Sequence, residues 1–137
     1  MVLPPLLNGV LPDGTYHASL SEIWQVFDHP RSTTRPRLNQ ALQHASALIW
    51  AKDSLATIFV DGSYITDKID PIDVDLAVRS DIWDDTTFAV DFALAYPGEE
   101  RLIDFFFNRH QTTQRMEDLF REIQGSNITK GVIQLLP

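Results

Sequence analysis

Two neighbouring segments of this sequence carry residue types that could bind a phosphorylated ligand through a metal ion. An apolar run, Leu55–Val60, is followed closely by Gly62 and Ser63, and after a short loop Asp73 and Asp75 open a second apolar run. Glycine lets the backbone approach a ligand closely, and a turn after a strand directs N–H groups and a hydroxyl towards an anion. Together, the two segments indicate a site for chemistry rather than only a scaffold.

The spacing of the two aspartates indicates a cation. If residues 73–78 form a β-strand, Asp73 and Asp75 share one face, about 6.6 Å apart along the strand. Like charges this close on a largely apolar element repel each other, and a raised pKa or a bound cation compensates. Mg²⁺ takes oxygen ligands, often one or two carboxylates together with substrate phosphates. We therefore expect a divalent ion beside a phosphate cradle, which together would make a nucleotide pocket.

A third carboxylate stands out further along the chain. Asp104 lies within the apolar run Arg101–Phe107, where an ionised side chain is costly to bury without compensation. If this run forms a strand beside residues 73–78, Asp104 completes a three-carboxylate cluster. The alternative is a salt bridge with an arginine such as Arg79 or Arg101. We favour the cluster.

These motifs are similar to those of a known superfamily. A Gly-Ser pair followed at short range by Asp-x-Asp and an apolar strand resembles the signature of the DNA polymerase beta-like nucleotidyltransferases, in particular their small "minimal" bacterial members. The match covers roughly residues 55–80. Weaker agreement with small nucleotidyltransferase-like proteins extends to both ends of the chain, at residues 11–14 (LPDG) and 130–133 (KGVI).

The resemblance implies a fold, a reaction and roles for individual residues. In that superfamily, three acidic residues bind two Mg²⁺ ions, the Gly-Ser turn binds the triphosphate, and a nucleotidyl group passes to an acceptor. The residues that would hold the metal ions, Mg²⁺ or alternatively Mn²⁺, are Asp73, Asp75 and Asp104. The residues that would bind the nucleoside triphosphate are Gly62, Ser63 and Lys68. Asp73 and Asp75 would bridge both ions, and Asp104 would hold the ion that activates the acceptor hydroxyl.

The sequence leaves open which acceptor would receive the nucleotidyl group and whether transfer activity is retained. Small relatives modify a partner protein, as in toxin–antitoxin or defence systems, or an RNA end; a small molecule is a further acceptor class. Many minimal members carry Arg-Gly soon after Gly-Ser, whereas residues 64–68 here read YITDK, with Lys68 as the nearby cation. A second interpretation is therefore an inactive nucleotidyltransferase-like binding or antitoxin subunit. A third is a structural domain whose acids make ordinary ion pairs.

Composition narrows the class of protein. The chain of 137 residues is long enough for one domain, residues 1–137, and too short for two ordinary ones. Without cysteine, neither disulfides nor thiolate metal sites can form. The N-terminus has neither a basic region nor a long apolar segment, so we expect a cytoplasmic protein with no membrane partner.

The net charge of the chain argues against a broad nucleic-acid-binding surface. The net charge is −8, whereas binding along a nucleic-acid backbone normally needs a basic face. A local patch could exist at Arg31, Arg35 and Arg37, but a solvated loop and helix start is the favoured interpretation. The oligomeric state is left open by the sequence.

The order of apolar patterns predicts a single α/β (α+β) domain with a nucleotidyltransferase-like fold. After an irregular N-terminal segment, residues 1–18, we expect helices from near Leu20 to Asp28, from Pro36 to about Lys52, from about Asp84 to Tyr96, and over Gln111–Gln124. The expected strands are Leu55–Val60, Asp73–Val78, Arg101–Phe107 and Lys130–Leu136, the last a candidate for a sheet edge. The loop after Ser63 is too short for a crossover helix, so its strands should be antiparallel. We expect a small mixed sheet with helices mainly on one face and an acidic cleft on the other.

Overall fold

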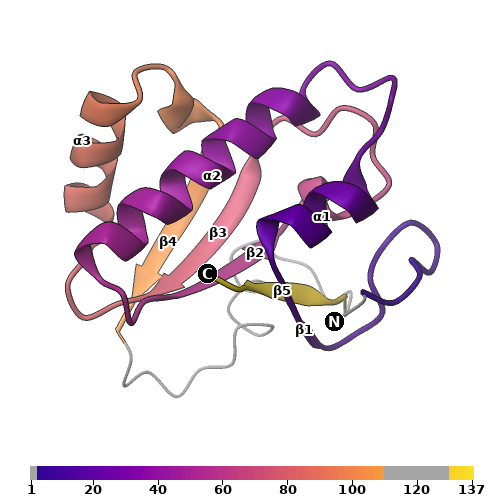
Figure 1. The fold of residues 1–137 in the computed structure, drawn as a ribbon, viewed down its shortest axis with the longest axis horizontal. Helices are drawn as coiled ribbons and strands as arrows, with labels where there is room; N and C mark the ends of the chain where they lie inside the picture. Colours follow the sequence, from indigo (N-terminus) through magenta and orange to yellow (C-terminus); the bar gives the residue numbers. More distant parts are fainter. Residues whose placement is uncertain (1–2, 110–129) are drawn as a thin grey trace.

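A mixed five-stranded β-sheet forms the centre of the molecule. The computed structural model describes residues 3–109 and 130–137, and its strands run in the order β1-β5-β2-β3-β4 (Figure 1). The strands are β1 (Thr15–Ala18), β2 (Thr57–Asp61), β3 (Val74–Arg79), β4 (Ile103–Asn108) and β5 (Val132–Leu135). The helices are α1 (Leu20–Phe27), α2 (Arg35–Lys52) and α3 (Asp85–Ala95), with short 3-10 turns η1 (Ser63–Ile65) and η2 (Glu99–Arg101). The predicted fold class, a single small domain with a mixed sheet, is confirmed.

The helix boundaries follow from local chemistry. Ser19 and Glu22 form the predicted capping box at the start of α1. Pro36 lies in the first turn of α2, where its missing N–H costs nothing. At the start of α3 the side chain of Asp84 accepts a hydrogen bond of 2.7 Å from the backbone N–H of Thr87. The three helices begin within one residue of the positions that the sequence predicted.

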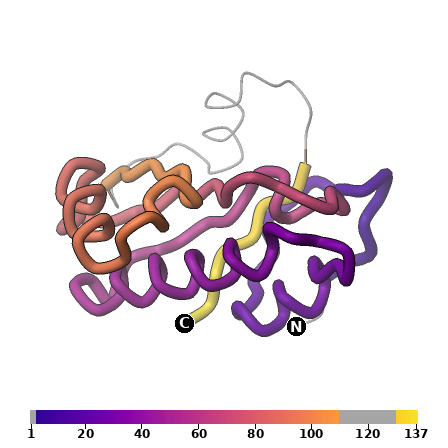
Figure 2. The backbone as a smooth tube through the Cα atoms, turned by 90° about the horizontal axis from the view of Figure 1, so that it is seen from above, coloured from indigo at the N-terminus to yellow at the C-terminus, as the bar shows by residue number. Residues whose placement is uncertain are grey.

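The helices cover one face of the sheet. Helix α2 runs diagonally across the strands (Figure 1), and α1 and α2 lie on the same side of the sheet when it is viewed from above (Figure 2). On α3, Phe88 packs against Phe105 and Phe107 of β4, with ring centroids 4.8 and 5.1 Å apart. The main core therefore lies between the sheet and the helices, and the opposite face of the sheet does not belong to it.

Two predictions about the ends of the chain are wrong. Residues 15–18 are not irregular but form β1, and β5 is not an edge strand, because β1 pairs with it in parallel and β2 pairs with its other side. The pairing is tight at Gly131, where an added Cβ would lie 2.4 Å from the carbonyl oxygen of Pro12. A four-residue strand carries too little pattern of its own to be recognised, since its partner lies at the other end of the sequence.

Several boundaries also differ from the prediction. Strand β2 begins at Thr57 rather than Leu55, and Asp73 lies one residue before β3. The start of the predicted strand Arg101–Phe107 belongs to the turn η2, so β4 begins at Ile103. The predicted helix Gln111–Gln124 lies outside the described residues.

Arg35 is a structural residue rather than part of a solvated patch. Its side chain is buried, and its guanidinium donates hydrogen bonds to the backbone carbonyls of Tyr64 at 2.7 Å, Thr66 at 2.9 Å and Lys68 at 2.7 Å. A planar guanidinium with five donors can satisfy several carbonyls at once. Arg35 therefore fixes the loop between β2 and β3 to the first turn of α2.

We predict that Arg35→Met lowers the free energy of unfolding by about 2–4 kcal/mol, because it leaves three inward-facing carbonyls without their donor. Chemical denaturation followed by circular dichroism measures the change. The matched control is Arg37→Met in the same turn of α2, where the side chain is exposed. Equal effects of the two substitutions would contradict the structural role of Arg35.

Candidate functional site

Three strands place their aspartates in one row across the sheet. In the register of the sheet, Asp61 of β2 lies opposite Asp75 of β3, and Asp75 lies opposite Asp104 of β4. The alternation of each strand directs their neighbours Val60, Leu76 and Ile103 into the core. The aspartates therefore lie on the face of the sheet opposite the helices, as the sequence predicted for Asp75 and Asp104.

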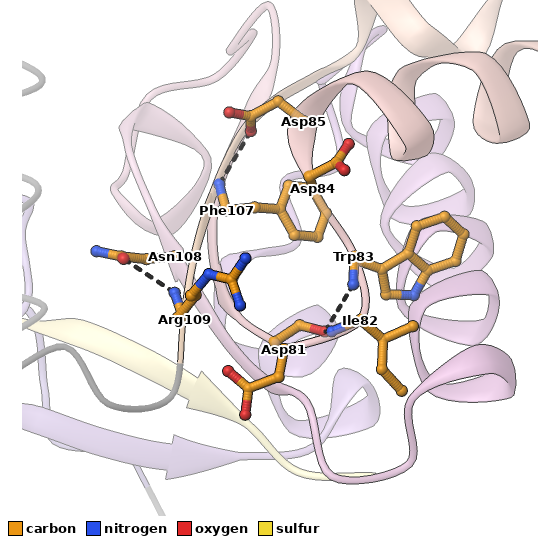
Figure 3. Close-up of a pocket in the computed structure, with 9 residues that line it drawn as sticks. Asp81, Ile82, Trp83, Asp84, Asp85, Phe107, Asn108 and Arg109 are labelled. Carbon is orange, nitrogen blue, oxygen red and sulfur yellow. Dashed lines mark hydrogen bonds between the residues drawn. The ribbon is translucent and has the colours of Figure 1, made fainter.

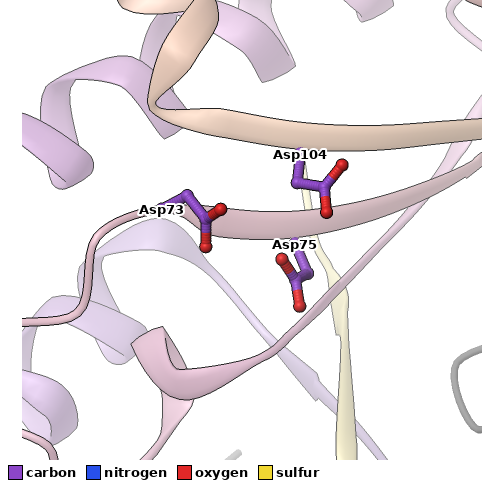
Figure 4. Close-up of side chains that lie close together, drawn as sticks. All are labelled: Asp73, Asp75 and Asp104. Atoms are coloured by element: carbon purple, nitrogen blue, oxygen red, sulfur yellow. The ribbon is translucent and has the colours of Figure 1, made fainter. Parts of the chain in front are cut away.

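Asp73 joins this row from the residue before β3. One carboxylate oxygen from each of Asp73, Asp75 and Asp104 lies within 4.8 Å of the others. Figure 4 shows the three side chains pointing towards a common space beside β3 and β4. Asp104 is exposed, whereas Asp73 and Asp75 are half-buried, so the cluster opens to solvent on the side of Asp104. The predicted three-carboxylate cluster is present.

The cluster concentrates negative charge in a poorly solvated place. Burial raises the pKa of Asp75 to about 7, and neighbouring carboxylates add to the shift. In decreasing order these neighbours are Asp73, Asp104 and Asp61. Burial, followed by the charge of Asp104, also raises the pKa of Asp73. A set of three convergent carboxylates with these shifts fits a hard divalent cation, because such an ion takes oxygen ligands and favours their ionised forms.

Gly62 brings the backbone against the cluster. Its φ is +87° and its ψ −170°, a conformation that is essentially restricted to glycine. An added Cβ would lie 2.5 Å from Oδ2 of Asp75. Ser63 follows directly and starts η1, with a half-buried side chain. The predicted Gly-Ser turn therefore lies beside the carboxylates.

Two lysines contribute positive charge from different parts of the chain. Lys68 is exposed, and its charge opposes the upward shift in the pKa of Asp73. Lys130 places Nζ 3.5 Å from Oδ1 of the buried Asp61 and opposes the upward shift in the pKa of Asp75. Sequence reasoning identified Lys68 but missed Lys130 as a site residue. Its only signal was the weak similarity of residues 130–133 to nucleotidyltransferase-like proteins.

A separate cavity lies at the other end of β3 and β4. This cavity has a volume of about 350 Å³ and is lined by residues 80–85 and 107–109 (Figure 3). Asn108, the last residue of β4, and Arg109 line this cavity, whereas Asp104 lies at the beginning of the same strand. The carboxylate cluster and the cavity are therefore different places on the sheet.

The described residues define a small α/β protein with a carboxylate cluster at one end of a mixed sheet. The chain belongs to the family described as "Family of unknown function (DUF6932)", which it matches over residues 5–136. Comparison with curated proteins and with solved structures gave no match. No helix among residues 3–109 and 130–137 is long and apolar enough to cross a membrane.

We predict that the thermal stability of the metal-free protein falls as pH rises from 5 to 8. The pKa of Asp75 in the folded state, about 7, lies above the ordinary value near 3.9 of an unfolded chain. The stability contributed by its protonated form is complete below about pH 4 and is lost as pH rises through about 7. Melting temperatures in EDTA across this range measure the effect.

Asp75→Asn is the control for this pH dependence, because an amide does not ionise. The melting temperature of the variant minus that of the wild type should increase from pH 5 to pH 8, and Mg²⁺ at pH 8 should raise the melting temperature of the wild type more than that of the variant. Parallel pH profiles for the two proteins would contradict the assignment to Asp75.

We predict that Gly62→Ala abolishes or strongly weakens Mg²⁺ binding and destabilises the fold by about 1–3 kcal/mol, because the methyl group meets the Asp75 carboxylate and the backbone is strained. Isothermal titration with Mg²⁺ and thermal melting measure the two effects. Gly98→Ala is the matched control, since Gly98 also has a positive φ of +90° but open space around its Cβ position. Retention of wild-type Mg²⁺ affinity in Gly62→Ala would show that the turn does not shape the cluster.

Proposed function

We propose that this protein is a metal-dependent nucleotidyltransferase that moves a nucleoside monophosphate from a nucleoside triphosphate to an acceptor hydroxyl. The observation that carries the proposal is the convergence of Asp73, Asp75 and Asp104, with carboxylate oxygens within 4.8 Å of one another. The adjacent Gly62 turn and the resemblance of residues 55–80 to DNA polymerase beta-like nucleotidyltransferases support it.

The three carboxylates would hold two Mg²⁺ ions, or Mn²⁺ in their place. When bound, the ions supply positive charge to the attacking and leaving oxygens of an in-line displacement at the α-phosphate. Gly62 and Ser63 would bind the triphosphate through the turn, because backbone N–H groups and a hydroxyl can donate hydrogen bonds to phosphate oxygens. The exposed ammonium of Lys68 would offset part of the phosphate charge.

The reaction forms one bond and breaks one. The acceptor oxygen bonds to the α-phosphorus, the bond from that phosphorus to the bridging oxygen of the β-phosphate breaks, and pyrophosphate leaves. The acceptor hydroxyl loses its proton to solvent. Because Asp104 is the most exposed carboxylate of the cluster, the acceptor would approach from its side.

The net charge of the protein bears on the class of acceptor that receives the nucleoside monophosphate. A net charge of −8 disfavours extended contact with a nucleic-acid backbone, so a partner protein or a small molecule is favoured over an RNA end. A toxin–antitoxin or defence system would supply a partner protein of this kind. The absence of Arg-Gly after Gly62 and Ser63 supports the second candidate, an inactive binding or antitoxin subunit, which the same experiment distinguishes.

We predict transfer of label from α-labelled nucleoside triphosphates, with Mg²⁺ or Mn²⁺, to the protein itself, to total RNA or to a component of a lysate. The double substitution Asp73→Ala and Asp75→Ala should reduce transfer to background, because it removes two of the three carboxylates. The matched control is Asp13→Ala with Asp91→Ala, which removes the same charge away from the cluster.

Each outcome separates the candidates. Transfer that is lost in the first double variant and kept in the control supports the enzyme and identifies its acceptor class. A thermal shift with Mg²⁺ and nucleotide but no transfer to any acceptor would replace the enzyme with the inactive binding subunit. Neither transfer nor a shift would leave the cluster as a structural feature and overturn the proposal.

A further inference from the structure

Phe106 is an exposed aromatic residue beside the carboxylate cluster. On β4 it lies two residues after Asp104, so both side chains leave the same face of the sheet about 6.6 Å apart along the strand. Its exposed fraction is 37%, whereas its neighbours Phe105 and Phe107 pack against Phe88 on the helix side. Phe106 therefore does not belong to the main core.

The residues beside Phe106 in the sheet make its surroundings apolar. In the sheet register, Phe106 lies opposite Ala77 of β3, and Ala77 lies opposite Phe59 of β2. This apolar row runs next to the acidic row of Asp61, Asp75 and Asp104 on the same face of the sheet. Ala77 and Phe59 are themselves buried, with exposed fractions of 0% and 7%, so Phe106 is the exposed member of this row. A flat ligand would lie against the exposed part of the Phe106 ring.

The exposure of Phe106 is informative because the residue lies close to the carboxylate cluster. Single exposed apolar side chains are common and need no explanation by themselves. Here the ring lies two residues along β4 from Asp104, one of the carboxylates that would hold the metal ions to which the phosphates of a nucleotide bind. A nucleotide carries its base one sugar away from its phosphates, and every base has a flat π-face that stacks on aromatic rings.

We propose that Phe106 is the stacking surface for the nucleobase of the donor nucleotide, whose phosphates bind through the metal ions held by Asp73, Asp75 and Asp104. The inference rests on the proposed function and extends it, because it assigns the residue that contacts the base of the donor nucleotide. Stacking is tolerant of base identity, so the four nucleoside triphosphates should all bind, with the larger purine rings binding more tightly.

The test compares a ligand that has a base with one that lacks it. Isothermal titration measures the affinities of Mg²⁺-ATP and Mg²⁺-tripolyphosphate for the wild type and for Phe106→Ala. We expect the substitution to weaken ATP binding by about tenfold and to change tripolyphosphate binding by less than about twofold, since tripolyphosphate has no base to stack. Phe106→Trp should keep or improve ATP binding.

A matched control and the remaining outcomes make the test decisive. Val90→Ala removes a similarly exposed apolar side chain from α3, on the helix side of the sheet, and should change neither affinity. Equal weakening of both ligands by Phe106→Ala, or no weakening of either, would overturn the stacking role while leaving the phosphate site in place. If the wild type binds neither ligand, the proposed function fails, and the role of Phe106 fails with it.

Discussion

The repulsion among carboxylates at one end of the sheet is the constraint on which the rest of the site depends. Four aspartates from three segments meet there, and the pKa of Asp75, which lies between Asp61 and Asp104 in the sheet, is raised to about 7. Such an arrangement costs stability, so it needs either protons or cations to offset it. Among the described residues, Lys130 beside Asp61 and Lys68 near Asp73 provide part of this compensation. The remaining charge is what makes the cluster suited to a divalent ion.

The surroundings keep this unfavourable arrangement in place. Strands β2 and β4 pair with both sides of β3, so Asp75 cannot move away from its neighbours without breaking the sheet. The Gly62 backbone closes on the carboxylate of Asp75, and Arg35 holds the following loop through three carbonyls. The loop is also tied at its far end, where Asp70 accepts a hydrogen bond of 2.8 Å from the N–H of Thr33. Two elements therefore determine the position of the turn, α2 from one side and β3 from the other.

The sequence predicted local features well and long-range ones unevenly. The starts of α1 and α3, the extent of α2 and the Gly-Ser turn depend on residues close together in the chain, where periodicity and turn chemistry act directly. Asp104 was predicted because a carboxylate among apolar strand residues is anomalous by itself. The site role of Lys130 and the strand β1 were not predicted. A lysine or a four-residue strand has no distinctive pattern of its own, and the partners of both lie in distant parts of the chain. Arg35 was misinterpreted for the same reason, since the carbonyls that bury it belong to a distant loop.

The mixed direction of the strands explains why the site lies where it does. Because β3 and β4 are parallel and in register, their first aspartates, Asp75 and Asp104, lie side by side at the amino ends of the two strands. Because β2 is antiparallel to β3, its carboxyl end reaches the same place and delivers Gly62 there. Had β2 run parallel to β3, the glycine turn would lie at the opposite end of the sheet, beside the cavity of residues 80–85 and 107–109. The combination of one antiparallel and one parallel neighbour is therefore what brings the Gly62 turn to a row of carboxylates. The short loop after Ser63 enforces the antiparallel pairing, because it leaves no room for a crossover.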